Sequence, residues 1–301
     1  MIETGWRTVI LDSPSELSCS DGNLVIKNDV EKTIPLAELR TVLINSTATT
    51  LSVELINELK NNHVKVIFCD SRHNPSCEIA GYGGHNDSAG RLLDQTGWTE
   101  ERKSVAWQSI VYHKINNQCN LLNYWGIPYP EKLNEYRDTI KENDSTNREG
   151  QASRIYFNRL FGMTFVRHSS DNINSALNYG YTILLSCVNR IVALYGYNTE
   201  LGIKHCNRSN SFNLSCDIME PFRPFVDLIV YINKENNLDW DYKKKLVALP
   251  YLPVLYDKNK TNLQNALEDY ARCVLNFMKT GDEKLLQKEI NFVQKEYGTV
   301  G

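Results

Sequence analysis

The chain has 301 residues, of which 42% are hydrophobic and 23% are charged. This usage is typical of globular proteins and excludes a disordered chain, a collagen-like repeat and a coiled-coil rod. The formal net charge of −3 excludes a globally basic nucleic-acid binder, although a local basic groove remains open. Eight cysteines are spread along the chain without clustering, and we expect reduced thiols.

In the first part of the chain apolar and polar residues alternate with a period of two, which predicts a compact, mostly β unit. Asp21-Gly22 supplies the positive φ angles of a tight hairpin turn between the second and third strands. Pro35 cannot donate a ladder hydrogen bond, so it belongs at a sheet edge or a strand start. The predicted strands are 6–11, 17–20, 24–27, 33–36, 41–44 and 64–69, with a helix over 52–61.

Residues 76–97 are rich in turn-forming residues and predict a linker. Beyond it the apolar residues recur about every 3.6 positions, which predicts helices. These helices are expected over 99–124, 130–142, 146–161, 172–195, 217–234, 241–249 and 262–279, the fifth kinked at Pro221 and Pro224. The fold class is therefore α+β, with a small β-rich N-terminal domain (1–75) and a large all-α domain (98–301).

The longest apolar stretch covers residues 176–197 and is interrupted by Asn178, Asn189 and Arg190. It therefore predicts a buried helix of a soluble protein rather than a membrane span.

Three segments of the helical part carry polar groups that a plain bundle does not need. The first is Asn147–Gly150, where the spacing Thr146-x-x-Glu149 favours a capping box. Gly150 inside a helix costs about 1 kcal/mol relative to alanine, and a close approach of another backbone would explain it.

The other two segments are 202–207, with His205, and 217–224, with Asp217 and Glu220. On its own, the pattern around His205 predicts a surface residue in a loop. The two acidic residues are predicted to interact with the dipole of a helix at its N-terminus. Together, however, two carboxylates and an imidazole could converge on Mg²⁺ or Mn²⁺ and serve phosphodiester chemistry.

The charge distribution between residues 141 and 225 fits a polyanionic partner, with nine basic against seven acidic residues. Seven of the nine are arginines, which bind phosphate through two parallel hydrogen bonds. A solvated surface of mixed charge explains the same count equally well. Zinc at Cys69-x3-His73-x3-Cys77 is disfavoured, because a fourth ligand is not evident.

In combination, several motifs resemble those of the CRISPR-associated spacer-acquisition integrase, in particular its type II-A form. They are Gly5–Val9, Val66–Asp70, Asn147–Gly150 followed by Ala152–Gly162, Asn178–Thr182, Leu201–His205 and Asp217–Pro224. The segment 82–88 departs from the type II-A pattern, in which a similar segment carries an arginine, so we expect a DNA contact there to be lost or moved.

The resemblance implies a metal-dependent DNA endonuclease and integrase of antiviral defence. It would insert foreign DNA fragments into a CRISPR array by attack of a 3′-hydroxyl on a phosphodiester. Glu149, His205 and Glu220 would hold Mg²⁺ or Mn²⁺ and carry catalysis, with Asp217 as a neighbouring acidic group. This replaces the capping interpretation of Glu149.

The resemblance also implies partners and a bacterial cytoplasmic location, with no membrane contact. The β-rich domain would mediate homodimerisation, and a small ferredoxin-like adaptation subunit would join the dimer. Double-stranded DNA, as incoming fragment and as leader–repeat, would be the substrate. Further partners would be the type II-A effector nuclease and an accessory adaptation protein. We expect phosphate contacts from Arg148, Arg154, Lys204, Arg208 and Arg223.

Two other functions compete with this one. A non-enzymatic nucleic-acid scaffold would use the acidic residues only to cap helices. A general structure-specific nuclease, for example in DNA repair, would use the same metal but leave hydrolysed ends.

Overall fold

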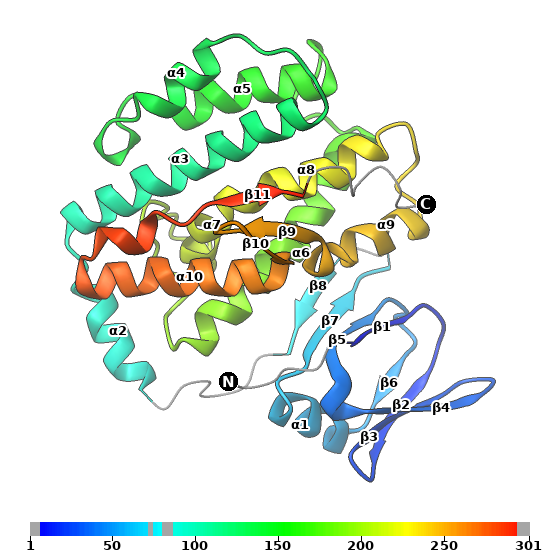
Figure 1. Ribbon diagram of the computed structural model, residues 1–301. Helices are drawn as coiled ribbons and strands as arrows, with labels where there is room; N and C mark the ends of the chain where they lie inside the picture. Colours follow the sequence, from blue (N-terminus) through cyan, green and yellow to red (C-terminus); the bar gives the residue numbers. More distant parts are fainter. Residues whose placement is uncertain (1–6, 72–74, 80–86, 294–301) are drawn as a thin grey trace. The chain divides into compact units, whose positions relative to one another are not determined.

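Figure 1 shows the computed structural model of the chain, which describes residues 7–71, 75–79 and 87–293. The chain divides into two compact units, Met1–Gly83 and Gly84–Gly301. The first is β-rich with one helix and the second is mainly helical, so the predicted order of a β-rich part followed by a helical part is confirmed. Gly5, Trp6, His73 and residues 82–86, which carried part of the sequence argument, lie outside the described residues.

The β-rich unit holds two four-stranded sheets. In the first sheet the order is β1-β5-β7-β8, and only β8 runs antiparallel to its neighbour. Its strands are β1 (Arg7–Leu11), β5 (Leu39–Ile44), β7 (Lys65–Cys69) and β8 (Pro75–Glu78). The second has the order β4-β3-β2-β6, with β4 (Glu31–Pro35), β3 (Asn23–Lys27), β2 (Glu16–Ser20) and β6 (Thr50–Leu51).

The turn chemistry predicted for this unit is confirmed. Asp21 and Gly22 adopt φ angles of 50° and 74° and join β2 to β3 as an antiparallel hairpin. Pro35 ends β4, which is an edge strand of its sheet, so its missing N–H costs no ladder bond.

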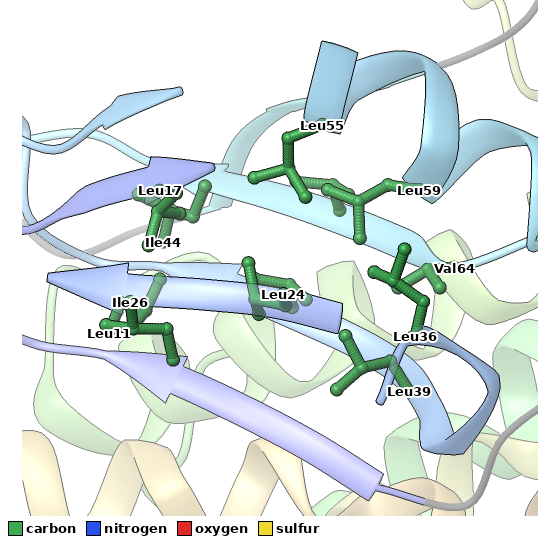
Figure 2. Close-up of a cluster of buried hydrophobic side chains, with 12 residues drawn as sticks. Leu11, Leu17, Leu24, Ile26, Leu36, Leu39, Ile44, Leu55, Leu59 and Val64 are labelled. Carbon is green, nitrogen blue, oxygen red and sulfur yellow. The ribbon is translucent and has the colours of Figure 1, made fainter. Parts of the chain in front are cut away.

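Leucines from both sheets and from α1 (Val53–Asn61) form the core of this unit. The side chain of Ser52 caps α1 by accepting the N–H of Leu55 over 3.2 Å. Leu55 and Leu59 then point from one face of the helix toward Leu24 and Ile44 (Figure 2). Each fully buried leucine stabilises the unit by about 1.5–3 kcal/mol, which holds the two sheets together.

Two regular elements occupy the range predicted as a linker. Strand β8 ends at Glu78, and helix α2 (Ser88–Thr96) belongs to the second unit. The amide of Gln95, which is buried in α2, donates to the carbonyls of Asn198 (2.8 Å) and Leu201 (2.7 Å). Helix α2 is therefore a packed part of the helical unit and not a free connection.

Helix α3 (Glu100–Tyr124) is the central element of the second unit. Figure 1 shows α4 (Lys132–Asp138) and α5 (Arg148–Phe161) on one side of it and α10 (Leu263–Thr280) on the other. The remaining helices are α6 (Asn172–Leu194), α7 (Asn213–Met219), α8 (Arg223–Ile232) and α9 (Trp240–Val247), with short 3-10 turns η2 (Glu142–Asp144) and η3 (Glu220–Phe222).

The break predicted in the fifth helix is present. The segment divides into α7, η3 and α8, with Pro221 in the 3-10 turn and Pro224 in the first turn of α8. A proline inside a helix removes one hydrogen bond and clashes with the preceding turn, which explains the break.

The description of the second unit as all-α needs one correction. Three strands form an antiparallel sheet of order β10-β9-β11: β9 (Pro253–Tyr256), β10 (Asn259–Asn262) and β11 (Ile290–Phe292). The turn between β9 and β10 places Asp257 and Lys258 at φ angles of 47° and 67° without a glycine. The sequence therefore carried no strong hairpin signal there.

Across the described ranges, we find no helix with the length and apolar character needed to cross a bilayer. None of the eight cysteines, all of which lie within the described residues, forms a disulfide in the structure.

Candidate active site

A buried lysine in the middle of α3 brings two of the predicted metal ligands together. The Lys114 side chain is 9% exposed, and its Nζ lies 2.6 Å from Glu149 Oε1 and 2.5 Å from Glu220 Oε2. Those two carboxylate oxygens are therefore at most 5.1 Å apart, the sum of the two distances. Burial opposes the charge of Lys114, yet the neighbouring Glu220 and Glu149 raise its pKa. The convergence of the two glutamates was predicted, whereas the lysine between them was not.

The N-terminus of α5 explains why Glu149 is free to face this lysine. The carboxylate of Asp144 accepts the N–H of Arg148 over 2.7 Å and that of Glu149 over 3.0 Å. Asn147, in a left-handed conformation at φ 54°, is the N-cap residue. The predicted capping box between Thr146 and Glu149 is therefore wrong, because other side chains already cap the helix.

Two glycines fit their positions because a side chain would collide there. A Cβ on Gly150 would lie 2.7 Å from Asn147 Oδ1, so the neighbour that this glycine accommodates is the capping side chain, and not another backbone as predicted. A Cβ on Gly202 would lie 2.3 Å from the carbonyl oxygen of His205 and 2.8 Å from Asp217 Oδ2. Gly202 thus lets the loop that carries His205 fold tightly over Asp217.

Asp217 holds that loop and orients His205. Its buried carboxylate accepts the N–H groups of Ile203 (2.6 Å), Lys204 (2.9 Å) and His205 (3.2 Å). His205 Nδ1 also donates to Asp217 Oδ1 over 2.5 Å. Burial raises the pKa of Asp217 despite these donors. A carboxylate in this place fixes the ring and makes its second nitrogen more basic, as it does for metal-bound histidines.

The imidazole of His205 lies within electrostatic range of both glutamates. Its pKa is raised by the hydrogen bond to Asp217, and the charges of Glu220 and Glu149 raise it further. Its ring meets that of Trp107 edge to face, with centroids 5.7 Å apart, and its side chain is 44% exposed. The histidine is therefore held on one side and open to solvent on the other.

Glu220 has a second cationic partner. Arg223 Nε donates to Glu220 Oε1 over 2.8 Å, while the Glu220 side chain is only 4% exposed. Although burial opposes ionisation, Arg223 and Lys114 hold the pKa of Glu220 well below its usual range. The Arg223 guanidinium lies over the Tyr181 ring at 4.6 Å. Arg223 thus serves the carboxylate, and this contact weakens its prediction as a DNA-binding residue.

Behind Arg223 lies a buried hydrogen-bonded group that sequence reasoning missed. The hydroxyls of Tyr156 (2.8 Å) and Tyr181 (2.5 Å) both donate to the carboxylate of Asp227. Burial raises the pKa of Asp227 to about 6. This group supports the tyrosine on which the arginine rests.

The three predicted ligands are not preformed as one metal cage. Over the ranges 7–71, 75–79 and 87–293, no three His, Cys, Asp or Glu side chains are arranged to hold an ion as they stand. Glu149 and Glu220 share the Lys114 ammonium, and Asp217 faces the His205 loop instead. The donor set still fits a hard divalent cation, because two carboxylates already converge on one positive charge beside an imidazole.

The family model described as "CRISPR associated protein Cas1" matches residues 8–250. The chain belongs to the Cas1 family. A curated relative, the CRISPR-associated endonuclease Cas1 of Neisseria meningitidis serogroup C (strain 8013), is 32% identical over 227 residues, covering 75% of each chain. A Cas1 endonuclease of Francisella tularensis subsp. novicida (strain U112) is 28% identical over 285 residues, covering 84% of this chain and 89% of its own.

Solved structures share the fold of this Cas1 protein. A casposase bound to integration product superposes with a TM-score of 0.78 at 17% identity, covering 98% of this chain and 96% of its own. A Cas1 protein from Thermotoga maritima gives a TM-score of 0.73 at 14% identity, covering 91% and 97%. The predicted family is confirmed, and the chain is a member of a family of CRISPR-associated endonucleases, whereas the type II-A form stays a prediction.

The predicted DNA-contacting residues of this Cas1 chain differ in their surroundings. Arg154 and Arg208 are exposed, and no described residue bonds their guanidinium groups. Lys204 donates to the backbone and side chain of Asn143. Arg148 lies over the Tyr136 ring at 4.7 Å. Beside His205, a cavity of about 590 Å³ is lined in part by Arg208.

One face of α3 gathers the segments of the Cas1 site. Trp107 contacts His205, Lys114 contacts Glu149 and Glu220, and the amide of Asn117 donates to the carbonyl of Pro221 over 2.8 Å. The sequence signal for this face was present but was not used: Lys114 and Asn117 are polar residues at helical spacing among buried apolar ones.

Proposed function

We propose that this chain is a metal-dependent DNA nuclease and integrase that inserts DNA fragments into a CRISPR array. The observation that carries the proposal is the convergence of Glu149 and Glu220 on one cationic group beside a histidine held by Asp217. Membership of the Cas1 family supports the CRISPR context. The casposase with the same fold is described as bound to an integration product, which supports strand joining as the reaction class.

The reaction is a transesterification. The oxygen of a 3′-hydroxyl forms a new bond to phosphorus, the bond to the leaving 3′-oxygen breaks, and that oxygen takes up a proton. One phosphodiester replaces another, so the reaction needs no external energy source. Glu149, Glu220 and His205 would hold Mg²⁺ or Mn²⁺, which when bound would stabilise negative charge on the phosphoryl oxygens.

The residues of the chain supply positioning and proton transfer. The hydrogen bond from Nδ1 to Asp217 leaves Nε2 of His205 as the nitrogen that can bind a cation or accept the proton of the attacking hydroxyl. The raised pKa of His205 makes it a better proton acceptor. Arg208 and Arg154, exposed and without protein partners among the described residues, would contact backbone phosphates.

Partners and location follow as further parts of the proposal. A solved structure with this fold is described as a Cas6-RT-Cas1–Cas2 complex, which supports a Cas2 subunit as partner. We expect a homodimer joined by the small ferredoxin-like subunit, acting on double-stranded DNA in the bacterial cytoplasm. An effector nuclease and an accessory adaptation protein remain expected partners if the type II-A form is correct.

The test is strand transfer on branched DNA with Mn²⁺ or Mg²⁺. We expect joined products from the wild-type protein, their loss with EDTA, and their loss in Glu149→Ala and Glu220→Ala. Glu268→Ala, which removes an exposed carboxylate on α10, is the matched control and should retain activity. Activity that persists in both site variants would show that the site is misassigned. Hydrolysed ends without joined strands would favour a general nuclease, and DNA binding without any reaction would favour a scaffold.

A further inference from the structure

The structure places Lys114 where a cation must lie to neutralise both glutamates. We propose that Lys114 is an internal counter-cation that holds Glu149 and Glu220 in the metal-free protein and competes with the divalent ion for them. This inference rests on the proposed function, since it concerns the same two carboxylates. It assigns a role to a residue that the metal chemistry itself does not need.

Lys114 is buried and fully paired. Its side chain is 9% exposed, and lysines are almost never buried unless they are paired. Its two partners are Glu149 and Glu220, and no other described residue bonds its ammonium group. The lysine is therefore held in place by the two carboxylates alone.

The Lys114 ammonium lies where an ion bound to both carboxylates would lie. Its nitrogen is 2.6 Å from Glu149 Oε1 and 2.5 Å from Glu220 Oε2. Magnesium binds its oxygen ligands at about 2.0–2.1 Å, so an ion bound to both oxygens would take the position between them that the ammonium occupies. An ammonium group and a divalent ion cannot occupy this space together, because their like charges repel at such short range.

Charge and anchoring distinguish the two cations of the site. Glu149 and Glu220 carry two negative charges, and Lys114 and Arg223 carry two positive charges. Arg223 is fixed by both Glu220 and the Tyr181 ring, whereas Lys114 has a flexible four-carbon stem and no ring of a described residue against its ammonium group. When a divalent ion binds, Lys114 is therefore the cation that leaves the carboxylates.

Binding of Mn²⁺ to the purified full-length protein tests the proposal without any measurement of activity. The free Mn²⁺ signal in electron paramagnetic resonance gives the Kd for wild type, Lys114→Met and the control Lys244→Met. Lys244 lies on α9 with its side chain 43% exposed, so this control removes the same charge far from the carboxylates in sequence. We expect Lys114→Met to bind Mn²⁺ at least tenfold more tightly than wild type and Lys244→Met to bind it within about twofold. Equal or weaker binding by Lys114→Met overturns the proposal.

A second measurement uses the unmutated lysine, in case Lys114→Met does not fold. The ammonium ¹⁵N resonance of Lys114 is observed in the metal-free protein and is identified by its absence in Lys114→Arg. We expect Mg²⁺ to shift or broaden this resonance as the lysine leaves the carboxylates. A resonance that stays unchanged at saturating Mg²⁺ contradicts the displacement.

Failure of this inference is distinguishable from failure of the proposed function. If Glu149→Gln weakens Mn²⁺ binding but Lys114→Met does not strengthen it, the metal site stands and the competing role of Lys114 is wrong. If Glu149→Gln leaves Mn²⁺ binding unchanged in every background, the metal site itself is misassigned and the inference falls with it.

Discussion

Asp217→Asn is the substitution that most directly tests the reasoning about the His205 loop. The Asp217 carboxylate is fully buried and accepts hydrogen bonds from four donors: the N–H groups of Ile203 and Lys204 on Oδ2, the ring nitrogen of His205 on Oδ1, and the N–H of His205 on both. In asparagine one oxygen becomes an NH₂ group. If the remaining oxygen keeps the N–H groups of Ile203 and Lys204, the NH₂ group must face the N–H and the ring nitrogen of His205.

The expected loss of stability follows from that count. Hydrogen bonds to charged groups contribute about 1.5–3 kcal/mol and neutral ones about 0.5–1.5 kcal/mol, and a buried unpaired N–H costs about 1–3 kcal/mol. Two weakened bonds and one orphaned N–H would cost about 3–5 kcal/mol, and removal of a buried charge offsets part of this. We expect a net loss of about 2–4 kcal/mol in the free energy of unfolding, measured by urea denaturation.

The substitution should also change the chemistry of His205. An NH₂ group facing Nδ1 makes that nitrogen an acceptor, so the ring proton moves to Nε2, which then offers no lone pair. We expect metal affinity or strand-transfer activity to fall about 10–100-fold, as for other residues that orient a ligand. The ¹⁵N shifts of the His205 ring report the tautomer independently of activity.

A matched control is Asp241→Asn, because the Asp241 side chain is 85% exposed and pairs with Lys244 on the surface. This variant should lie within about 0.5 kcal/mol of wild type and keep its activity. The reasoning is refuted if Asp217→Asn matches this control in stability, tautomer and activity.

Three further outcomes are expected. Burial raises the pKa of Asp227 to about 6, so the stability that its neutral form contributes is fully present below about pH 4 and is lost as the pH rises through about 6. Asp227→Asn should remove this dependence of the melting temperature on pH, and a variant that keeps the wild-type dependence would contradict the prediction. Gly202→Ala should lower both stability and activity because its Cβ meets backbone at 2.3 Å, whereas Gly97→Ala meets nothing closer than 3.4 Å and should be tolerated in the same assays. Leu24→Ala should cost about 2–5 kcal/mol in urea denaturation because Leu24 is fully buried, and a result as small as that of Val30→Ala, at a residue 60% exposed, would contradict the packing.

Long elements with strong periodicity and a side-chain cap could be predicted from the sequence almost to the residue. Helices α3, α6 and α10 each begin after a residue whose side chain accepts a backbone N–H, namely Thr99, Asp171 and Asn262. Such caps mark helix starts in the sequence itself. The small C-terminal sheet could not be predicted in the same way, because β9 pairs with β11 across more than thirty intervening positions, from Tyr256 to Ile290.

The residues of the candidate site also differ in whether a local sequence signal identifies them. Glu149, His205 and Glu220 could be named in advance because the motifs that carry them are specific to the family. Lys114 was missed although its spacing among apolar positions was a signal, since a lone lysine in a helix is usually a solvated residue, and only the fold shows which carboxylates it faces. The cap at Asp144 was missed for a related reason. Asp144 accepts N–H groups four and five positions later, whereas a capping box joins residues three positions apart.

The arrangement of the site along α3 has a consequence for how such chains can diverge. Trp107 and Lys114, two turns apart, fix the positions of the His205 loop and the two glutamates. One residue inserted between them would turn the two contacts by about 100° relative to each other, which no loop could correct. The loops that lead into the site can therefore vary in length among relatives, while the interval within this helix must stay constant.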